Sequence, residues 1–400
     1  MSIVMPQLHA MLATMLFACG AMVLQRGVYL YTAEVHAFSA VQNLAVSVLY
    51  GVAYIFGAAA LAPRLGRRRR GPRMALLAAT LGGVGLLMNV AGQLAPMGVV
   101  ALLMGVSIGA AWPLLNGMLL AGQPPACHRV MLGRFNLSWA VGVPLCMLGS
   151  GWLLHHVPRA LPVFACFVLL CVAVVLMAGL RRRALTTGPT PTRQAPADNA
   201  ASARAVSPAV LRTGRWGMVV CYSLMFTLIP VQPAIFGELG YTPSQAAYFS
   251  ITFDLARLAA FGVMIATPVW QGSFLGLAMA MLAAPLAMGL CVAGNTLPWV
   301  LVGHVGLGAA AGYLYYAPLM HGLSKHREAV SSTGKHEAAR GLSLIIGPLL
   351  GVIGAGAGSS GGIDGLLWSV VLPATALMLI LILGGLACGS RGAVRVGIAD

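Results

Sequence analysis

The sequence predicts an all-α membrane protein with twelve transmembrane helices, arranged as two pseudo-symmetric six-helix bundles. Of its 400 residues, 59% are hydrophobic and only 8% are charged, whereas soluble domains carry about 25% charged residues. Twelve helices of ~20 residues would use ~240 residues, which matches the hydrophobic share. The apolar runs are continuous rather than alternating, so they fit helices and not barrel strands. This composition excludes a soluble enzyme, a secreted disulfide-rich protein and a disordered chain.

Proline, glycine and charged residues divide the chain into twelve apolar segments. Each segment is long enough to cross the hydrocarbon core of a bilayer as a helix. The predicted spans are 8–31, 39–62, 74–95, 97–121, 130–154, 159–180, 215–239, 243–267, 274–294, 298–323, 336–360 and 364–388.

Basic residues gather in alternate loops. The chain holds 24 Lys and Arg against 8 Asp and Glu, a formal charge of +16. Twenty-one of the basic residues follow even-numbered spans or lie in the tail, and only Arg159 lies in an opposite loop. Because cytoplasmic loops are enriched in Lys and Arg, we expect both termini to be cytoplasmic. We expect the membrane to be a bacterial inner membrane. This distribution also explains the charge without a nucleic-acid partner.

The segment between the sixth and seventh spans has the composition of a linker. It is rich in Pro, Ala, Thr and Ser and lacks apolar periodicity, which is typical of flexible segments. The predicted organisation is therefore an N-terminal bundle (1–180), a cytoplasmic linker (181–214), a C-terminal bundle (215–390) and a cytoplasmic tail (391–400).

The two halves of the chain repeat one another. Three short patterns recur in the same order at a spacing near 203 residues, which indicates two bundles of the same topology. The paired segments are 34–42 with 238–245, 56–63 with 261–268, and 133–134 with 334–335.

The loop after the second span resembles the signature of the major facilitator superfamily, Gly-x-Leu-Ala-Asp-Arg-x-Gly-Arg-Arg. The first glycine is replaced by Ala59 and the acid by Pro63. The resemblance extends over essentially the whole chain and implies two six-helix bundles that carry a small molecule by alternating access. The matching residues are Leu61, Ala62, Arg64, Gly66, Arg67 and Arg68.

In that family the signature loop contributes to a cytoplasmic gate, so the resemblance implies this role for Arg64, Gly66, Arg67 and Arg68. Because Pro63 replaces the acid of the gate, Glu337 and Arg340 near span 11 are candidates for a substitute charge contact.

A second family pattern, used by proton-driven exporters in span 5, ends in Gly-Pro-x-x-Gly-Gly. Segment 142–151 departs from it, while 347–351 in span 11 fits better. This similarity favours export.

Ionisable residues inside spans are costly and usually serve a function. Asp254 and Arg257 lie three residues apart in span 8, which places them one helical turn apart on the same face. They are candidates for proton coupling, with a permanent ion pair between them as the alternative. His304 in span 10 is a third candidate because histidine titrates near neutral pH, although a lone buried histidine is more often a packing residue.

Arg26 in span 1 supplies a fixed positive charge, because arginine does not lose its proton in proteins. It either contacts an anionic substrate or pairs with Glu34, eight residues further along. Uncharged side chains in the spans are candidates for substrate contacts or for joining helices. They are Gln25, Asn43, Asn116, Asn136, Tyr222 and Gln232.

No cofactor or metal is predicted. The eight cysteines form no Cys-x-x-Cys pair, so we interpret them as packing residues. The 21 methionines raise the alternative of copper transport, but no set of His and Cys converges with them.

The sequence therefore predicts a monomeric secondary transporter in the lipid bilayer and not an enzyme. The transporter is expected to export a small organic solute in a proton-coupled process. Arg26 favours an anion as that solute. The alternatives are facilitated or proton-symport uptake, and a non-transporting receptor or assembly factor on the same fold.

Overall fold

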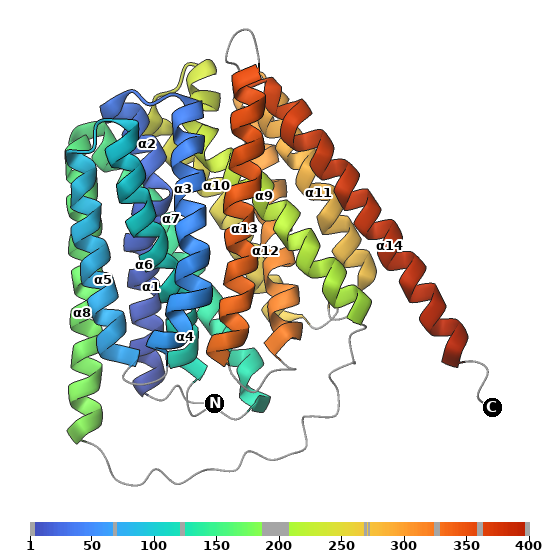
Figure 1. Cartoon of the computed structure of the whole chain (residues 1–400), viewed down its shortest axis with the longest axis horizontal. Helices are drawn as coiled ribbons and strands as arrows, with labels where there is room; N and C mark the ends of the chain where they lie inside the picture. The colour runs from blue at the N-terminus through green and yellow to red at the C-terminus, as the bar shows by residue number, and fades with distance from the viewer. Residues whose placement is uncertain are drawn as a thin grey trace.

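The computed structural model confirms an all-helical fold with twelve membrane-length helices. It describes residues 5–66, 70–120, 125–185, 208–267, 270, 273–323, 329–357 and 363–396. Within these residues all regular structure is helical, and twelve segments are long and apolar enough to cross a membrane. Figure 1 shows upright N-terminal helices on one side and C-terminal helices, several of them tilted, on the other.

The N-terminal bundle contains six spans, some made of two consecutive helices. A π-helical turn (Gly57–Leu61) follows α3, and short 3-10 turns precede α6 and α8. The helices are α1 (Met5–Gln25), α2 (Gly27–His36), α3 (Ala40–Phe56), α4 (Ala62–Leu65), α5 (Arg70–Leu86), α6 (Leu94–Leu120), α7 (Pro125–His156) and α8 (Leu161–Leu185).

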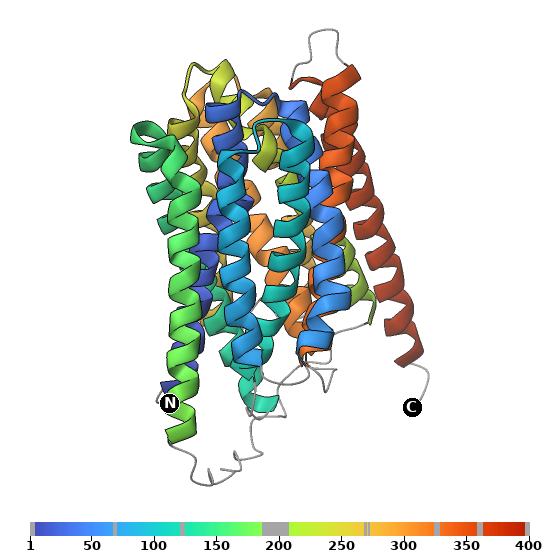
Figure 2. The same cartoon turned by 60° about the vertical axis from the view of Figure 1, so that its left-hand side comes forward.

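The C-terminal bundle also contains six spans, and a π-helical turn (Leu367–Val371) precedes its last helix. The last helices of the two bundles, α8 and α14, lie at opposite ends of the molecule (Figure 2). The helices are α9 (Pro208–Glu238), α10 (Pro243–Ala266), α11 (Phe274–Ala293), α12 (Leu297–Leu323), α13 (Ala329–Ala357) and α14 (Leu372–Val396).

The sequence repeat has a structural counterpart at the start of α3 and α10. Ser39 and Gln42 form a capping box at α3, and Thr242 and Gln245 form the same box at α10. In each, the hydroxyl oxygen accepts from the third helical amide and the glutamine oxygen accepts from the cap amide, which satisfies two donors that helix ends leave unpaired. Equivalent spans of the two bundles thus begin by the same local chemistry.

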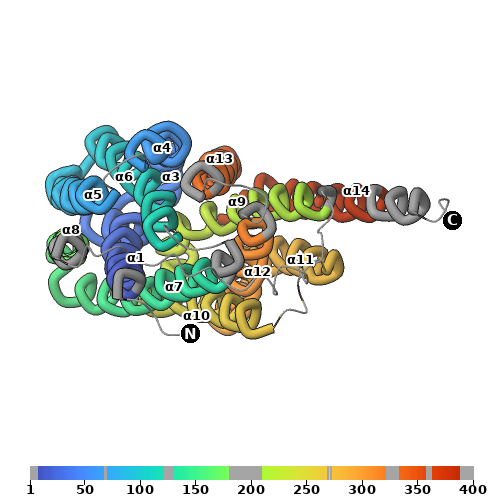
Figure 3. The backbone as a smooth tube through the Cα atoms, turned by 90° about the horizontal axis from the view of Figure 1, so that it is seen from below, coloured from blue at the N-terminus to red at the C-terminus, as the bar shows by residue number. Residues whose placement is uncertain are grey.

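Two helix pairs make the most extensive contacts between the bundles: α3 packs against α13, and α7 packs against α10 (Figure 3). Glycines allow the close approach. A Cβ atom on Gly51 would lie 2.8 Å from the backbone of Leu344, and one on Gly151 would lie 2.9 Å from the ring of Tyr248. Larger residues at these glycines would push the bundles apart.

The first span continues through Arg26 rather than ending before it. Arg26 separates α1 from α2, yet its amide still donates to the Met22 carbonyl at 2.8 Å. The span therefore extends to His36, and Arg26 lies well inside it, where an unpaired charge would be costly.

α1 begins and α14 ends at the same face of the molecule, which we call the terminal face (Figure 1). Residues 181–185 end α8 and residues 208–214 begin α9, while 186–207 lie outside the described residues. The side of the membrane on which the terminal face lies, and the domain boundaries at 180 and 215, remain predictions.

Candidate functional site

A buried carboxylate connects the two bundles at the centre of the molecule. Asp254 of α10 is 0% exposed. Its Oδ1 accepts from Arg257 Nη2 at 2.7 Å, one turn further along α10, and its Oδ2 accepts from Nη1 of Arg26 in the N-terminal bundle. We call these three residues the Asp254 cluster. The predicted pair on α10 is thus one part of a triad, and Arg26 pairs with Asp254 instead of Glu34.

The Asp254 cluster has more donors than its carboxylate can use. Nε and Nη2 of Arg26 and Nε of Arg257 have no hydrogen-bond partner among the described residues. Aromatic faces cover the two guanidinium groups: Arg257 lies 4.8 Å from the Trp139 ring centre, and Arg26 lies 5.6 Å from that of Phe253. Two arginines and one ionised carboxylate carry a net charge of +1, which is compatible with binding an anion.

A second buried carboxylate also connects the bundles. Glu337 of α13 accepts from Tyr315 at 2.8 Å, from Arg340 at 2.9 Å and from Tyr54 of α3. Arg340 also donates to the Tyr54 hydroxyl at 3.0 Å. We call these four residues the Glu337 cluster. Its one arginine and one carboxylate carry no net charge, and both carboxylate oxygens are hydrogen-bonded.

The two predicted asparagines Asn116 and Asn136 lie beside two tryptophans in the N-terminal bundle. Asn136 Oδ1 accepts from the Trp139 indole at 2.9 Å, and Asn116 Nδ2 donates to the Trp112 carbonyl at 3.2 Å. The Trp112 and Trp139 ring centres are 6.1 Å apart. We call these four residues the amide–aromatic cluster.

Trp139 connects this cluster to the C-terminal bundle. Its ring centre lies 5.4 Å from that of Phe261 and 5.9 Å from that of Tyr315, both at edge-to-face angles. Arg257 lies over the same indole. No local sequence pattern marks Trp139, Tyr54 or Tyr315, and aromatic residues are common in spans, so the roles of these three could not be predicted from the sequence.

His304 lies apart from the Asp254 cluster in its contacts. Its Nε2 is 3.3 Å from Gln232 Nε2 and its Nδ1 is 3.4 Å from Thr252 Oγ1, while its ring lies against Phe236. The structure therefore places the candidates His304 and Gln232 side by side. The contacts of His304 connect α12 to α9 and α10.

The remaining polar candidates have different surroundings. Asn43 donates to the Tyr29 carbonyl and accepts from Thr32, so it fixes α3 against α2. Gln25 is buried beside Arg26, and its Oε1 has no partner within the described part of the chain. Tyr222 lies against Tyr315, 5.8 Å between ring centres.

The signature loop lies at the terminal face. The side chain of Arg64 is exposed, and Gly66 ends α4. Arg70 donates to the Gly117 carbonyl at the end of α6, and Arg73 donates to the Leu65 carbonyl, so these arginines complete helix C-termini. Arg67 and Arg68 lie outside the described residues. The hydrogen bonds of Glu337 and Arg340 go to Tyr54 and Tyr315 rather than to this loop.

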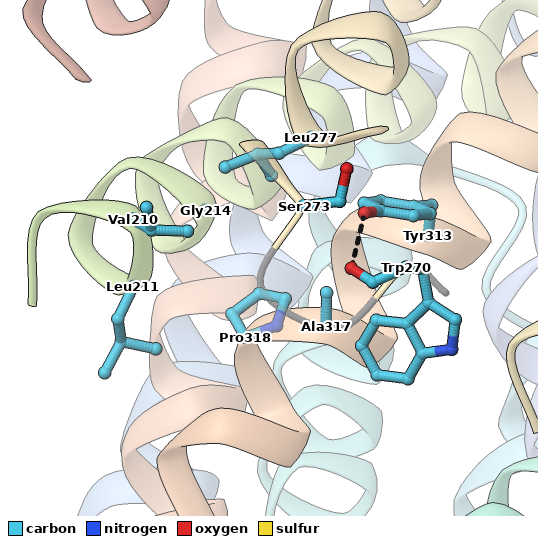
Figure 4. Close-up of a pocket in the computed structure, with 9 residues that line it drawn as sticks. All are labelled: Val210, Leu211, Gly214, Trp270, Ser273, Leu277, Tyr313, Ala317 and Pro318. Carbon is cyan, nitrogen blue, oxygen red and sulfur yellow. Dashed lines mark hydrogen bonds between the residues drawn. The ribbon is translucent and has the colours of Figure 1, made fainter. Parts of the chain in front are cut away.

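A small pocket lies within the C-terminal bundle, and no residue of the charged clusters lines it. Its wall is almost entirely apolar, and the one hydrogen bond drawn in Figure 4 joins the Tyr313 hydroxyl to the Trp270 carbonyl. α9, α11, α12 and the segment before α11 supply its lining, which is Val210, Leu211, Gly214, Trp270, Ser273, Leu277, Tyr313, Ala317 and Pro318. Without a charged lining residue, it is a poorer candidate than the Asp254 cluster for binding an ion.

Metal ligands do not gather in the part of the chain that the structure describes. No group of three or more His, Cys, Asp or Glu side chains there is placed to hold a metal ion. The six cysteines whose side chains are described are free thiols.

Solved transporters share this architecture. The nucleoside transporter NupG aligns with a TM-score of 0.65 and 13% identity, over 96% of this chain and 99% of that one. A bacterial homologue of the human lysosomal transporter Spinster, inward-facing and occupied, aligns with a TM-score of 0.66 and 14% identity over 96% of both chains. The human organic anion transporter MFSD10 aligns with a TM-score of 0.60 and 13% identity, over 95% of this chain and 98% of that one.

No family model and no curated protein matches the sequence. The structural alignments nevertheless cover nearly the whole chain, and they confirm the predicted fold: this protein has the fold of the major facilitator superfamily. At such low identity the likeness extends to the fold alone, so function must be argued from this chain's own residues.

Proposed function

We propose that this protein is a secondary transporter that carries a small organic anion across the membrane by alternating access, with Asp254 as the proton-coupling group. The observation that carries the proposal is the carboxylate of Asp254, buried and bonded to one arginine from each bundle. A group that links two bundles and can take up a proton connects protonation to their separation.

The charge of the Asp254 cluster supports an anionic solute. Arginine stays charged, so the cluster carries +1 when Asp254 is ionised and +2 when it is protonated. The unpartnered donors of Arg26 and Arg257 match the acceptor oxygens of a carboxylate, sulfonate or phosphate. A cation would meet repulsion at both stages. The structural neighbour MFSD10, an organic anion transporter, shows that this fold is compatible with such a solute.

The geometry supports symport best. An incoming anion and the Asp254 carboxylate compete for the same guanidinium donors, so protonation of Asp254 releases donors to the anion. Because linkage is reciprocal, anion binding then favours protonation of Asp254. Proton and anion would therefore travel together, and an inward proton gradient would drive uptake.

Proton-driven export is the second candidate, favoured by the glycine–proline pattern at 347–351. It requires the opposite linkage, in which solute and proton exclude each other. The sign of the linkage thus separates the two candidates.

The proposed orientation places the terminal face in the cytoplasm of a bacterium. The gate at the cytoplasmic end of the transport path is then formed by Arg64, Gly66, Arg67 and Arg68. The proposed working unit is a monomer. A cysteine introduced at Ala200, in the predicted linker, should resist impermeant thiol reagents in intact cells. Labelling equal to that of an external-loop control would reverse the orientation.

Transport is tested in proteoliposomes with an alkaline interior and a panel of labelled small sulfonates and carboxylates outside. We expect at least one anion to accumulate, Asp254→Asn to abolish the accumulation, and Glu34→Gln to preserve it, because Glu34 is an exposed carboxylate of α2. Sulfonates stay ionised and cannot cross the lipid as neutral acids, so protein-free liposomes provide a clean background. Absence of accumulation across the panel would refute the proposed transport.

A further inference from the structure

The amide–aromatic cluster holds three hydrogen-bonding atoms without a partner among the described residues: Trp112 Nε1, Asn116 Oδ1 and Asn136 Nδ2. Their side chains are at most 4% exposed. Buried polar atoms are nearly always paired in native proteins, so three unpaired ones in adjacent helices require an explanation. They offer two donors and one acceptor to a missing partner.

Local contacts fix the orientation of both amides. Asn136 Oδ1 accepts from the Trp139 indole, so its Nδ2 is the free end. Asn116 Nδ2 donates to the Trp112 carbonyl, so its Oδ1 is the free end. Rotating either amide by 180° would break its existing bond, because it would set donor against donor or acceptor against acceptor.

Aromatic rings pack around Trp112. The Trp112 ring centre lies 5.3 Å from that of Phe17, 6.3 Å from that of Phe135 and 6.1 Å from that of Trp139. Aromatic side chains favour flat partners, which they contact face to face with an offset or edge to face. The unpaired polar atoms of this cluster therefore belong to a region rich in aromatic rings, which is chemically suited to a planar partner.

Trp139 lies between these amides and the positive charge. Its indole donates to Asn136 of its own bundle, and the Arg257 guanidinium of the other bundle lies 4.8 Å from its ring centre. Trp139 thus adjoins both Asn136 and the N–H donors of the Asp254 cluster.

We infer that the transported solute is a planar heteroaromatic anion. Its charged group binds Arg26 and Arg257, its ring lies against Trp139 and Trp112, and polar atoms of the ring bond to Asn136 Nδ2 and Asn116 Oδ1. The charged end of this assignment rests on the proposed function, whereas the ring end rests on the amide–aromatic cluster. An aliphatic anion of the same charge would satisfy the arginines but leave the amides unpaired.

Three sulfonates of equal charge test the ring end: pyridine-3-sulfonate, benzenesulfonate and cyclohexanesulfonate. Their dissociation constants are measured by titration calorimetry on the full-length protein in lipid nanodiscs. An aromatic contact contributes a preference of about 2- to 10-fold, so benzenesulfonate should bind that much more tightly than cyclohexanesulfonate. A hydrogen bond to the ring nitrogen should favour pyridine-3-sulfonate over benzenesulfonate by about the same factor.

Single substitutions separate the preference for an aromatic ring from the preference for a ring nitrogen. Trp139→Leu should remove the preference for aromatic rings, while Trp139→Phe should keep most of it, so a folding defect in the first does not end the test. Asn136→Ala should remove only the preference for the ring nitrogen. Trp152→Leu and Asn295→Ala are matched controls, because Trp152 lies exposed on the same helix and Asn295 is exposed at the end of α11.

The outcomes distinguish this inference from the proposed function. Equal affinity for all three sulfonates, lost in Arg26→Gln, would overturn the heteroaromatic assignment and leave anion transport standing. A ring preference that survives in Trp139→Leu would also overturn it, because the ring would then lie elsewhere. No binding of any sulfonate would refute both.

Discussion

Asp254 and Glu337 each begin the same four-residue pattern, an acid followed three residues later by an arginine, on a helix of the C-terminal bundle. Each also reaches across to the N-terminal bundle, Asp254 to Arg26 and Glu337 to Tyr54. The surroundings differ. Glu337 receives donors from one arginine and two tyrosines, and Arg340 keeps one N–H group, at Nε, without a partner among the described residues. Asp254 is shared by two arginines, which keep between them three nitrogens unpartnered in the described part of the chain.

The difference shows that an acid–arginine pair has no fixed role. In the Glu337 cluster the charges cancel and both carboxylate oxygens are bonded, so the cluster holds α3 against α13 and gains little from further ligands. In the Asp254 cluster a positive charge and free donors remain, so a proton or an anion changes its energy. We expect the first to stabilise the fold and the second to couple transport.

Glu337→Leu should have the largest effect. It leaves the Arg340 guanidinium buried without its carboxylate, and loss of one partner of a buried pair costs ~3–5 kcal/mol. Thermal unfolding in detergent should occur at a clearly lower temperature, with accumulation and exchange both lost. Glu337→Gln keeps an acceptor for the tyrosines and should lose less. An unchanged unfolding temperature in Glu337→Leu would remove the proposed structural role.

Asp254→Asn should separate two modes of transport. A neutral amide cannot load or release a proton, so accumulation driven by a pH gradient should vanish while exchange at equal pH survives. The variant should also be stabilised by added anion more than the wild type, because its arginines have lost their carboxylate. The single variant should also unfold at a lower temperature, because two buried guanidinium groups lose their carboxylate. The double variant Asp254→Asn, Arg26→Gln should recover part of that loss. Loss of exchange in a stably folded single variant would mean that Asp254 is only a structural ion-pair partner.

Tyr54→Phe should have an intermediate effect. It removes two hydrogen bonds of the Tyr54 hydroxyl, one donated to Glu337 and one accepted from Arg340. A hydrogen bond to a charged group is worth ~1.5–3 kcal/mol, and Tyr315 and Arg340 still hold Glu337. We expect lower thermal stability with proton coupling intact. If proton-driven accumulation were lost in this variant, the Glu337 cluster would belong to the coupling machinery and the contrast with Asp254 would fail.

Arg64→Ala should have the smallest effect. Arg64 lies exposed at the terminal face and belongs to none of the buried clusters, so its loss should slow flux a few-fold and leave anion affinity unchanged. Flux and equilibrium binding measured on the same preparation check this expectation. A large loss of affinity with normal turnover would place the binding site near the signature loop.

The fold could be predicted from the sequence because its signals are local. The twelve apolar spans and the capping boxes at Ser39 and Thr242 need only neighbouring residues. The acid–arginine pair on α10 was predicted for the same reason.

The partners across the bundles could not be predicted, because they depend on packing between distant segments. Arg26 and Asp254 are 228 positions apart and Tyr54 and Glu337 are 283 apart, so the nearby Glu34 was the only partner that spacing offered Arg26. The amide atom that stays unpaired in Asn116 and in Asn136 likewise depends on which atom of each amide is hydrogen-bonded to a neighbouring group. Helical periodicity predicts on which face of a helix a residue lies, but it does not predict which segment packs against that face.

The direction of proton movement tests the central claim most directly. Proteoliposomes containing a pH-sensitive dye receive an inward gradient of pyridine-3-sulfonate, which stays ionised and carries no proton itself. Competition between the anion and Asp254 for Arg26 predicts that protons enter with the anion, so the wild-type interior should acidify and the Asp254→Asn interior should not. An interior that turns alkaline, or acidification that persists in Asp254→Asn, would contradict the account.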